Sequence, residues 1–142
     1  MTLREIADIL DASVLTGADV VDTTVIPNVY ACDLMSDVLA FCSPGSLLLT
    51  GLTNVQIVRT AQMLDIPAVV FVRGKIPLEE TVSLAKASGI PIILAKQSLY
   101  EVCGKLYAAG LKPCYRNEPC HSRLRRYSES CNLRRPSGFV RY

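Results

Sequence analysis

The sequence lacks most of the patterns on which common enzyme active sites are built. It has no tryptophan and a single histidine, His121, which lies in the last quarter of the chain. A Ser/His/Asp set for nucleophilic catalysis therefore cannot be assembled within residues 1–110. Neither a G-x-x-x-x-G-K-[ST] loop nor a G-x-G-x-x-G loop is present, so phosphate-transfer chemistry has no motif. We expect no catalytic activity, no metal and no cofactor.

Long apolar runs are missing as well. No run approaches the roughly 18–20 residues that a helix needs to cross a bilayer. The amino-terminal MTLREIADIL has acidic residues within an amphipathic pattern, unlike the apolar core of a signal peptide. We therefore expect no membrane contact and a cytoplasmic location.

Cysteine is not scarce, since the chain contains 6 of these residues. Cys32, Cys42 and Cys103 have apolar or helical surroundings, in which a thiol behaves as a small hydrophobic group. An intracellular α/β domain rarely carries disulfides. We expect reduced, buried thiols, and we interpret Cys103 as a packing residue.

The net charge of +2 hides an uneven distribution. Residues 1–110 carry 7 Lys/Arg and 11 Asp/Glu, a net −4, whereas residues 111–142 carry 8 and 2, a net +6. Half of all residues are hydrophobic, as in a globular domain with a substantial core. The change in composition predicts one domain over residues 1–111, followed by a basic Cys/Arg-rich tail over residues 112–142 that is irregular or disordered.

Helices and apolar strands alternate between Thr50 and Leu111. Two segments 24 residues apart, AQMLDIPAVVFV from Ala61 and AKASGIPIILAK from Ala85, share one design: a helix end, a tight turn before Ile-Pro, and an apolar strand. Strands that are apolar on both faces and alternate with helices belong in a parallel sheet covered on both sides. The predicted fold class is α/β, a three-layer α/β/α sandwich around a mostly parallel sheet.

Capping patterns mark where the helices begin. Thr2 with Glu5, and Ser98 with Glu101, match the S/T-x-x-E capping box at the starts of the first and last helices. Pro77 suits the first turn of a helix that we expect over residues 78–88.

Several segments resemble the DRTGG domain family in order and spacing. They are D-L-M-S-D at Asp33–Asp37, T-G-L-T-N at Thr50–Asn54, and the runs VRTAQMLDIPAVVFVRGK and SLYEVCGKLYAAGL. The resemblance covers residues 1 to about 112. It implies a fold like the N-terminal domain of HPr kinase and a non-catalytic regulatory or protein-interaction role, often as a homodimer. Stand-alone members occur near iron–sulfur and hydrogenase-related genes, which implies a protein partner in a redox or hydrogenase-related context.

One segment departs from that family. Where its namesake glycine pair would follow Asp22, this chain has Val25-Ile26-Pro27-Asn28. A role that depends on close backbone approach at those glycines need not carry over to this chain.

Four loops are expected at the carboxyl ends of the strands, where open parallel sheets bind ligands. A glycine before a helix start can present backbone amides to an anion, and basic side chains on neighbouring loops can add positive charge. We therefore predict a site for a small anionic ligand, such as a nucleotide, or for an acidic segment of a partner. The candidate residues are Asp33, Ser36, Asp37, Thr50, Gly51, Thr53, Asn54, Arg73, Gly74 and Lys75, with Lys96 as a further cation.

The same residues have purely structural interpretations. Asp33 or Ser36 is expected to cap the short helix that follows, and Thr53 or Asn54 the next helix. The segment Arg73-Gly74-Lys75 suits a solvated turn.

Asp33 and Asp37 are also spaced to share one helix face. A carboxylate pair there could coordinate Mg²⁺ or transfer a proton. Acidic residues at a helix start more often interact favourably with the helix dipole, and we favour that interpretation.

The apolar residues Leu34, Met35 and Leu39 of the same short helix are candidates for a two-fold interface between copies of the chain. The alternative is that they complete the core of a monomer. The first functional hypothesis is thus a regulatory or protein-interaction module that forms a homodimer. The second is a sensor that binds an anionic ligand or nucleotide at the carboxyl ends of the strands.

The tail from residue 112 has three interpretations. Its paired arginines could contact the phosphates of nucleic acid. Alternatively, Cys114, Cys120, His121 and Cys131 could bind zinc, although their spacing lacks the C-x₂-C pairing of common sites. We favour an irregular extension without either function, so nucleic acid is not an expected partner.

Overall fold

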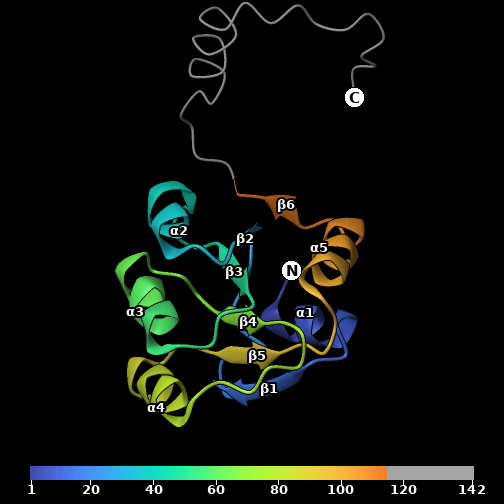
Figure 1. Cartoon of the computed structure of the whole chain (residues 1–142). Helices are drawn as coiled ribbons and strands as arrows, with labels where there is room; N and C mark the ends of the chain where they lie inside the picture. Colours follow the sequence, from blue (N-terminus) through green and yellow to red (C-terminus); the bar gives the residue numbers. More distant parts are fainter. Residues whose placement is uncertain (115–142) are drawn as a thin grey trace, which may run out of the picture.

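The computed structural model of the chain describes residues 1–114 (Figure 1). Helices and strands alternate along most of this part of the chain. The helices are α1 (Leu3–Ile9), α2 (Met35–Phe41), α3 (Val55–Met63), α4 (Glu79–Ser88) and α5 (Leu99–Ala108). The strands are β1 (Ser13–Thr16), β2 (Asn28–Ala31), β3 (Leu47–Thr50), β4 (Val69–Phe71), β5 (Ile92–Leu94) and β6 (Lys112–Pro113).

The strands form one sheet of 6 strands in the order β1-β5-β4-β3-β2-β6. Neighbours from β5 across to β6 pair in parallel, and only β1 is antiparallel, to β5. Helices α1 and α5 cover one face, whereas α2, α3 and α4 cover the other (Figure 1). The predicted three-layer α/β/α sandwich around a mostly parallel sheet is confirmed.

Residues of the central strands alternate between two apolar cores. Leu47 and Leu49 of β3 pack into the core beneath α1 and α5, and Leu48 packs into the core beneath α2, α3 and α4. All residues of β3 and β4 are buried. This burial on both faces explains why the strands read as continuous apolar runs rather than as alternating ones.

The two similar segments that begin at Ala61 and Ala85 also have the same local structure. Asp65 and Gly89 end their helices with left-handed backbones, at φ +52° and +69°. The amide of the next residue then donates to a carbonyl five residues back, from Ile66 to Ala61 and from Ile90 to Ala85, both at 3.0 Å. This closure lets the chain leave each helix and enter the following strand at once.

The predicted helix starts are confirmed in part. Thr2 and Glu5 form the complete capping box, with each side chain accepting a backbone amide. Ser98 accepts the amide of Glu101, but the Glu101 carboxylate accepts the Ser98 hydroxyl rather than its amide. Pro77 is predicted in the first turn of α4, but it lies just before Leu78, the cap residue of that helix, and is therefore outside the helix.

The domain contacts continue past Leu111. Strand β6 pairs with β2, and the amide of Cys114 donates to the carbonyl of Val29 at 2.9 Å. A two-residue strand that includes a proline has no detectable sequence pattern, and it is tolerated here because β6 lies at the sheet edge. The tail residues Cys120, His121 and Cys131, and the arginine pairs, lie outside the described residues.

Among residues 1–114, no helix has the length and apolar character needed to span a bilayer.

Thr16 provides a test of how β1 is fixed to the sheet. Its hydroxyl donates to the carbonyl of Ile90 and accepts the amide of Ile92, both at 2.9 Å, and its side chain is buried. Thr16→Val keeps the shape but leaves two buried backbone groups unpaired, so we expect the free energy of unfolding to fall by about 2–4 kcal/mol in urea titrations. Thr23→Val is the matched control, because the exposed Thr23 hydroxyl contacts only the carbonyl of Val20. A loss of similar size in both variants would contradict the anchoring role of Thr16.

Candidate ligand-binding edge of the sheet

The parallel strands bring the predicted loops to one edge of the sheet. The segments after β2, β3, β4 and β5 begin at Cys32, Gly51, Val72 and Ala95 respectively, and we call them together the carboxyl edge. Of the predicted residues, the structure brings Asp33, Thr50, Gly51 and Arg73 into direct contact there.

Asp33 fixes the loop after β3. Its Oδ1 accepts the hydroxyl of Thr50 at 3.0 Å and the amide of Gly51 at 2.7 Å. The Thr50 hydroxyl oxygen in turn accepts the amide of Leu52 at 3.2 Å. The prediction that the Gly51 amide is free for an anion is therefore wrong, because a carboxylate of the protein already occupies it.

The expected cap of α2 is also wrong. Leu34 occupies the cap position without a side-chain hydrogen bond, Asp33 is committed to the neighbouring loop, and Ser36 lies inside the helix. Asp37 does lie in the first turn of α2, as the dipole interpretation requires. Within residues 1–114, no hydrogen bond connects Ser36 or Asp37 to the loop that Asp33 fixes.

At α3 one of the two predicted cap residues, Asn54, is confirmed in position, but the expected capping hydrogen bond is absent. The carbonyl of Thr53 accepts the hydroxyl of Thr81 at 2.8 Å, which ties this loop to α4.

Arg73 is the most unusual residue of the carboxyl edge. Its backbone is left-handed at φ +64°, and Gly74 follows at φ +63°. Two hydrogen bonds to the segment after β5 hold this turn, from the Arg73 amide to Gln97 at 2.8 Å and from the Gly74 amide to Ala95 at 2.9 Å. The guanidinium of Arg73 lies against Gly51, where an added Cβ would clash with Nη2 and lie 3.2 Å from Cζ. A larger residue at position 51 would displace the exposed guanidinium from this place.

Three cations are exposed around this turn. Arg73, Lys75 and Lys96 all have exposed side chains, and within residues 1–114 the single ion pair joins Arg4 to Asp22 elsewhere. The carboxyl edge therefore presents a guanidinium and two ammonium groups to solvent, while the carboxylate of Asp33 accepts the amide of Gly51 at the same edge.

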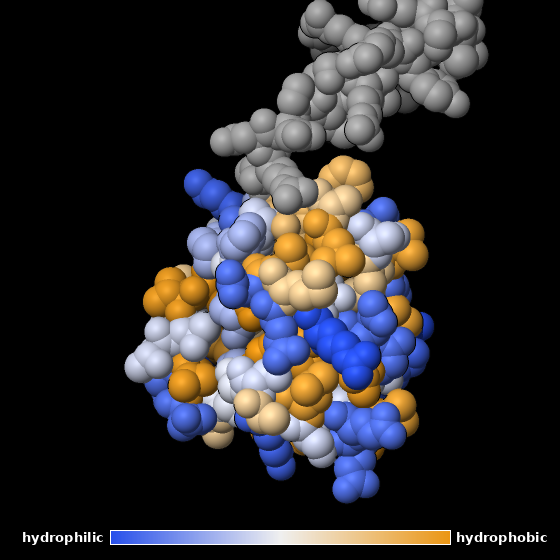
Figure 2. Space-filling view, turned by 90° about the vertical axis from the view of Figure 1, so that its left-hand side faces the viewer, coloured by the Kyte–Doolittle hydropathy of each residue, from blue (hydrophilic) through white to orange (hydrophobic). Residues whose placement is uncertain are grey.

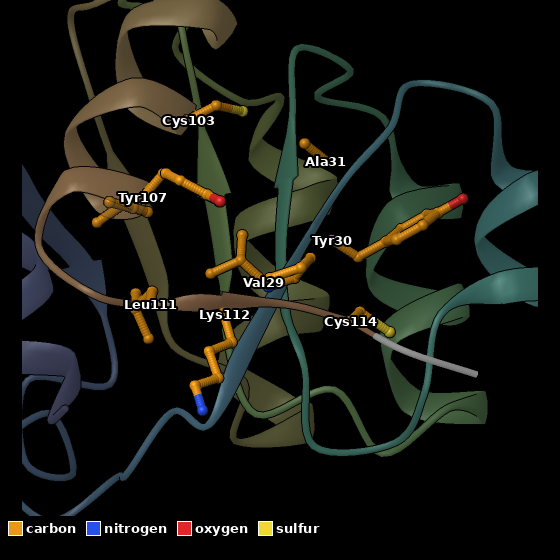
Figure 3. Close-up of a pocket in the computed structure, with 10 residues that line it drawn as sticks. Val29, Tyr30, Ala31, Cys103, Tyr107, Leu111, Lys112 and Cys114 are labelled. Carbon is orange, nitrogen blue, oxygen red and sulfur yellow. The ribbon is translucent and has the colours of Figure 1, made fainter. Parts of the chain in front are cut away.

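A second concave region was not foreseen. A mostly apolar pocket of about 320 Å³ lies between α5, β2 and β6 (Figure 3), and its walls include Val29, Ala31, Leu106, Tyr107 and Leu111. Six strands at about 4.8 Å spacing are wider than two helices of about 10 Å each. Helices α1 and α5 thus leave the β2–β6 side uncovered. This pocket could not be predicted, because the two residues of β6 have no recognisable strand pattern in the sequence.

Comparisons with known proteins support the fold. No family model matches the chain, and no match was found among curated proteins. The structure is similar to a crystal structure of the CBS and DRTGG domains of the regulatory region of a Clostridium perfringens pyrophosphatase, complexed with its activator, diadenosine tetraphosphate. The TM-score is 0.64 at 16% sequence identity, and the match covers 93% of this chain and 61% of that one. The chain therefore has a DRTGG-like α/β fold.

Proposed function

We propose that this chain is a non-catalytic regulatory domain that binds a small phosphate-bearing ligand at the carboxyl edge. The observation that carries the proposal is the strained turn at Arg73, whose exposed guanidinium lies against Gly51. A left-handed backbone costs an L-residue about 1–2 kcal/mol. Residues held in such conformations concentrate at ligand clamps, where the surrounding structure fixes them.

The electrostatics of this edge favour an anion with several oxygens. A guanidinium presents five donors in a fixed fork that matches phosphate, whereas the ammonium groups of Lys75 and Lys96 act as adjustable point charges. Because Asp33 already binds the Thr50 hydroxyl and the Gly51 amide, its contribution is to set the loop shape. The side chains, and not the Gly51 amide, are the expected ligand contacts.

The pyrophosphatase structure that shares this fold contains a dinucleoside tetraphosphate as its activator. We therefore choose nucleotides as the first probes. Titration of the full chain with ATP and with diadenosine tetraphosphate should raise the melting temperature in proportion to the logarithm of ligand concentration, since a ligand of the native state stabilises it by about 2.7 kcal/mol at 100 times Kd. Absence of any shift at millimolar concentrations of both ligands would refute the site.

Arg73→Gly should separate binding from stability. Removing the side chain relieves the strain at φ +64°, so the free energy of unfolding should rise by up to about 1 kcal/mol. Loss of the guanidinium should weaken nucleotide binding tenfold or more in calorimetry. The two effects have opposite signs, which a general loss of structure could not produce.

Asp65→Gly is the matched control for that variant. Asp65 is also left-handed and exposed, but it lies between α3 and β4, at the opposite edge of the sheet. Its replacement should stabilise the protein without changing nucleotide affinity. Equal affinity in the wild type and in Arg73→Gly would exclude Arg73 as a ligand contact.

A second candidate function is self-association through α2. Leu34, Leu39 and Phe41 have exposed fractions of 58%, 37% and 51%, and Figure 2 shows apolar side chains gathered over α2 at the top of the view. Met35, in contrast, is only 9% exposed and belongs to the core beneath α2, so it is not available for an interface. We propose that the exposed apolar residues of α2 form a two-fold contact between copies.

Charge placed on this surface should dissociate such a dimer. In sedimentation velocity at tens of micromolar, the wild type should be dimeric, and Leu39→Glu with Phe41→Glu should be monomeric, because burying carboxylates in an apolar contact is costly. Met63→Glu is the control, since Met63 is 73% exposed on α3 and outside this surface. A monomeric wild type would exclude the contact.

A further inference from the structure

The last described residue, Cys114, lies against the end of α2. Asn28 pairs with Lys112 and Val29 with Pro113, so the register places Cys114 beside Tyr30. Tyr30 packs against the core beneath α2, α3 and α4, and Cys114 therefore faces that side of the sheet. Cys114 is half-buried, and it is also one of the residues that line the apolar pocket (Figure 3).

The contacts of the Cys114 sulfur surround Cys42. Sγ accepts the amide of Ser43 at 3.0 Å, hydrogen-bonds to the Ser43 hydroxyl at 2.7 Å, and lies 3.8 Å from the carbonyl of Phe41. Phe41 and Ser43 are the two neighbours of Cys42 in the chain. The thiol of Cys42 contacts the same residue, with its Sγ 3.7 Å from the carbonyl of Ser43, and its side chain is fully buried. Both sulfur atoms thus contact Ser43.

The surroundings favour the thiolate of Cys114. Burial alone would raise the pKa of Cys114, but hydrogen bonds from Ser43, Ser46 and Cys42 outweigh this effect and lower it. The thiolate is the nucleophile in thiol chemistry. Cys103 shows the opposite behaviour, because burial raises its pKa.

We propose that Cys114 and Cys42 form a reversible disulfide, with Cys114 as the thiol that reacts first and Cys42 as the resolving thiol. With hydrogen peroxide as oxidant, the Cys114 thiolate attacks one peroxide oxygen, the O–O bond breaks, and hydroxide leaves as a sulfenic acid forms. The Cys42 thiol then attacks that sulfur, loses its proton and displaces water. In total, two thiols and one peroxide give one disulfide and two water molecules.

The other described thiols are placed differently. Cys32 contacts Leu34 at the start of α2, whereas Cys42 lies at the end of this helix. Cys103 lies on α5, and in Figure 3 it is at the end of the pocket opposite Cys114. These two residues provide controls within the same molecule.

The bond would join β6 covalently to α2. The closed loop contains most of the domain, and cross-links over long loops restrict the unfolded chain strongly. Strand β6 has only two residues, so without this bond it is held to β2 by little backbone pairing. We expect the oxidised chain to melt at least about 5 °C above the reduced chain.

Peptide mapping of the full chain tests the pairing. The reduced protein is treated with a small excess of hydrogen peroxide, remaining thiols are alkylated, and chymotrypsin cleaves after Phe41 to separate Cys42 from Cys32. The expected product links the Cys42 and Cys114 peptides, and dithiothreitol releases them, while Cys32 and Cys103 remain alkylated. An unmodified Cys114, or Cys114 linked to any other cysteine or to a second chain, would overturn the proposal.

Three variants show whether the contacts at Ser43 matter. Cys42→Ala keeps a small apolar side chain in the core and should abolish both the cross-link and the rise in melting temperature. Ser43→Ala retains both thiols but removes one donor, so oxidation of Cys114 should slow roughly three- to tenfold. Cys32→Ala should react like the wild type. A Ser43→Ala variant that oxidises at the wild-type rate would show that the Ser43 hydroxyl does not activate Cys114.

Discussion

The burial of β3 and β4 on both faces is the constraint from which the other features follow. A strand enclosed by helices on both sides cannot carry polar side chains along its length, because each would need a partner within an apolar core. In β3 the first polar residue is therefore the last one, Thr50, and its hydroxyl is paired with Asp33. Polar side chains in these strands are therefore confined to the strand ends, at the amino and carboxyl edges of the sheet.

Much of this arrangement could be predicted from the sequence, because it depends on local signals. The apolar runs, the Thr2 capping box and the two Ile-Pro turns each act within a few residues, and all are present in the structure. Of the two residues predicted to begin α3, Thr53 and Asn54, the second is the cap residue, although its side chain makes no capping bond. The position of the carboxyl edge could be predicted for the same reason, because neighbouring parallel strands all end on the same side of the sheet.

What could not be predicted depends on contacts between distant residues. The sequence predicts Asp33 as a helix cap because it precedes a short helix, but the groups that donate to it, the Thr50 hydroxyl and the Gly51 amide, lie at the end of the adjacent strand. Cys114 reads as part of an irregular tail, and only the pairing of β6 with β2 brings it to Ser43. In both cases a polar group could bond either to a local partner or to one distant in the sequence. Strand pairing in the sheet holds the distant partner at hydrogen-bonding distance, so that bond forms.

Helix α2 connects the two proposed sites. Its cap residue, Leu34, directly follows Asp33, which shapes the carboxyl edge, and the helix ends at Cys42, which contacts Ser43 before the start of β3. Seven helical residues extend only about 10 Å, so a displacement of one end of α2 moves the other. If a disulfide at Cys42 alters the position of Asp33, thermodynamic linkage requires that a bound nucleotide shift the reduction potential of the thiol pair by an equal free energy. A rigid α2 that stays in place in both redox states would leave the two sites independent.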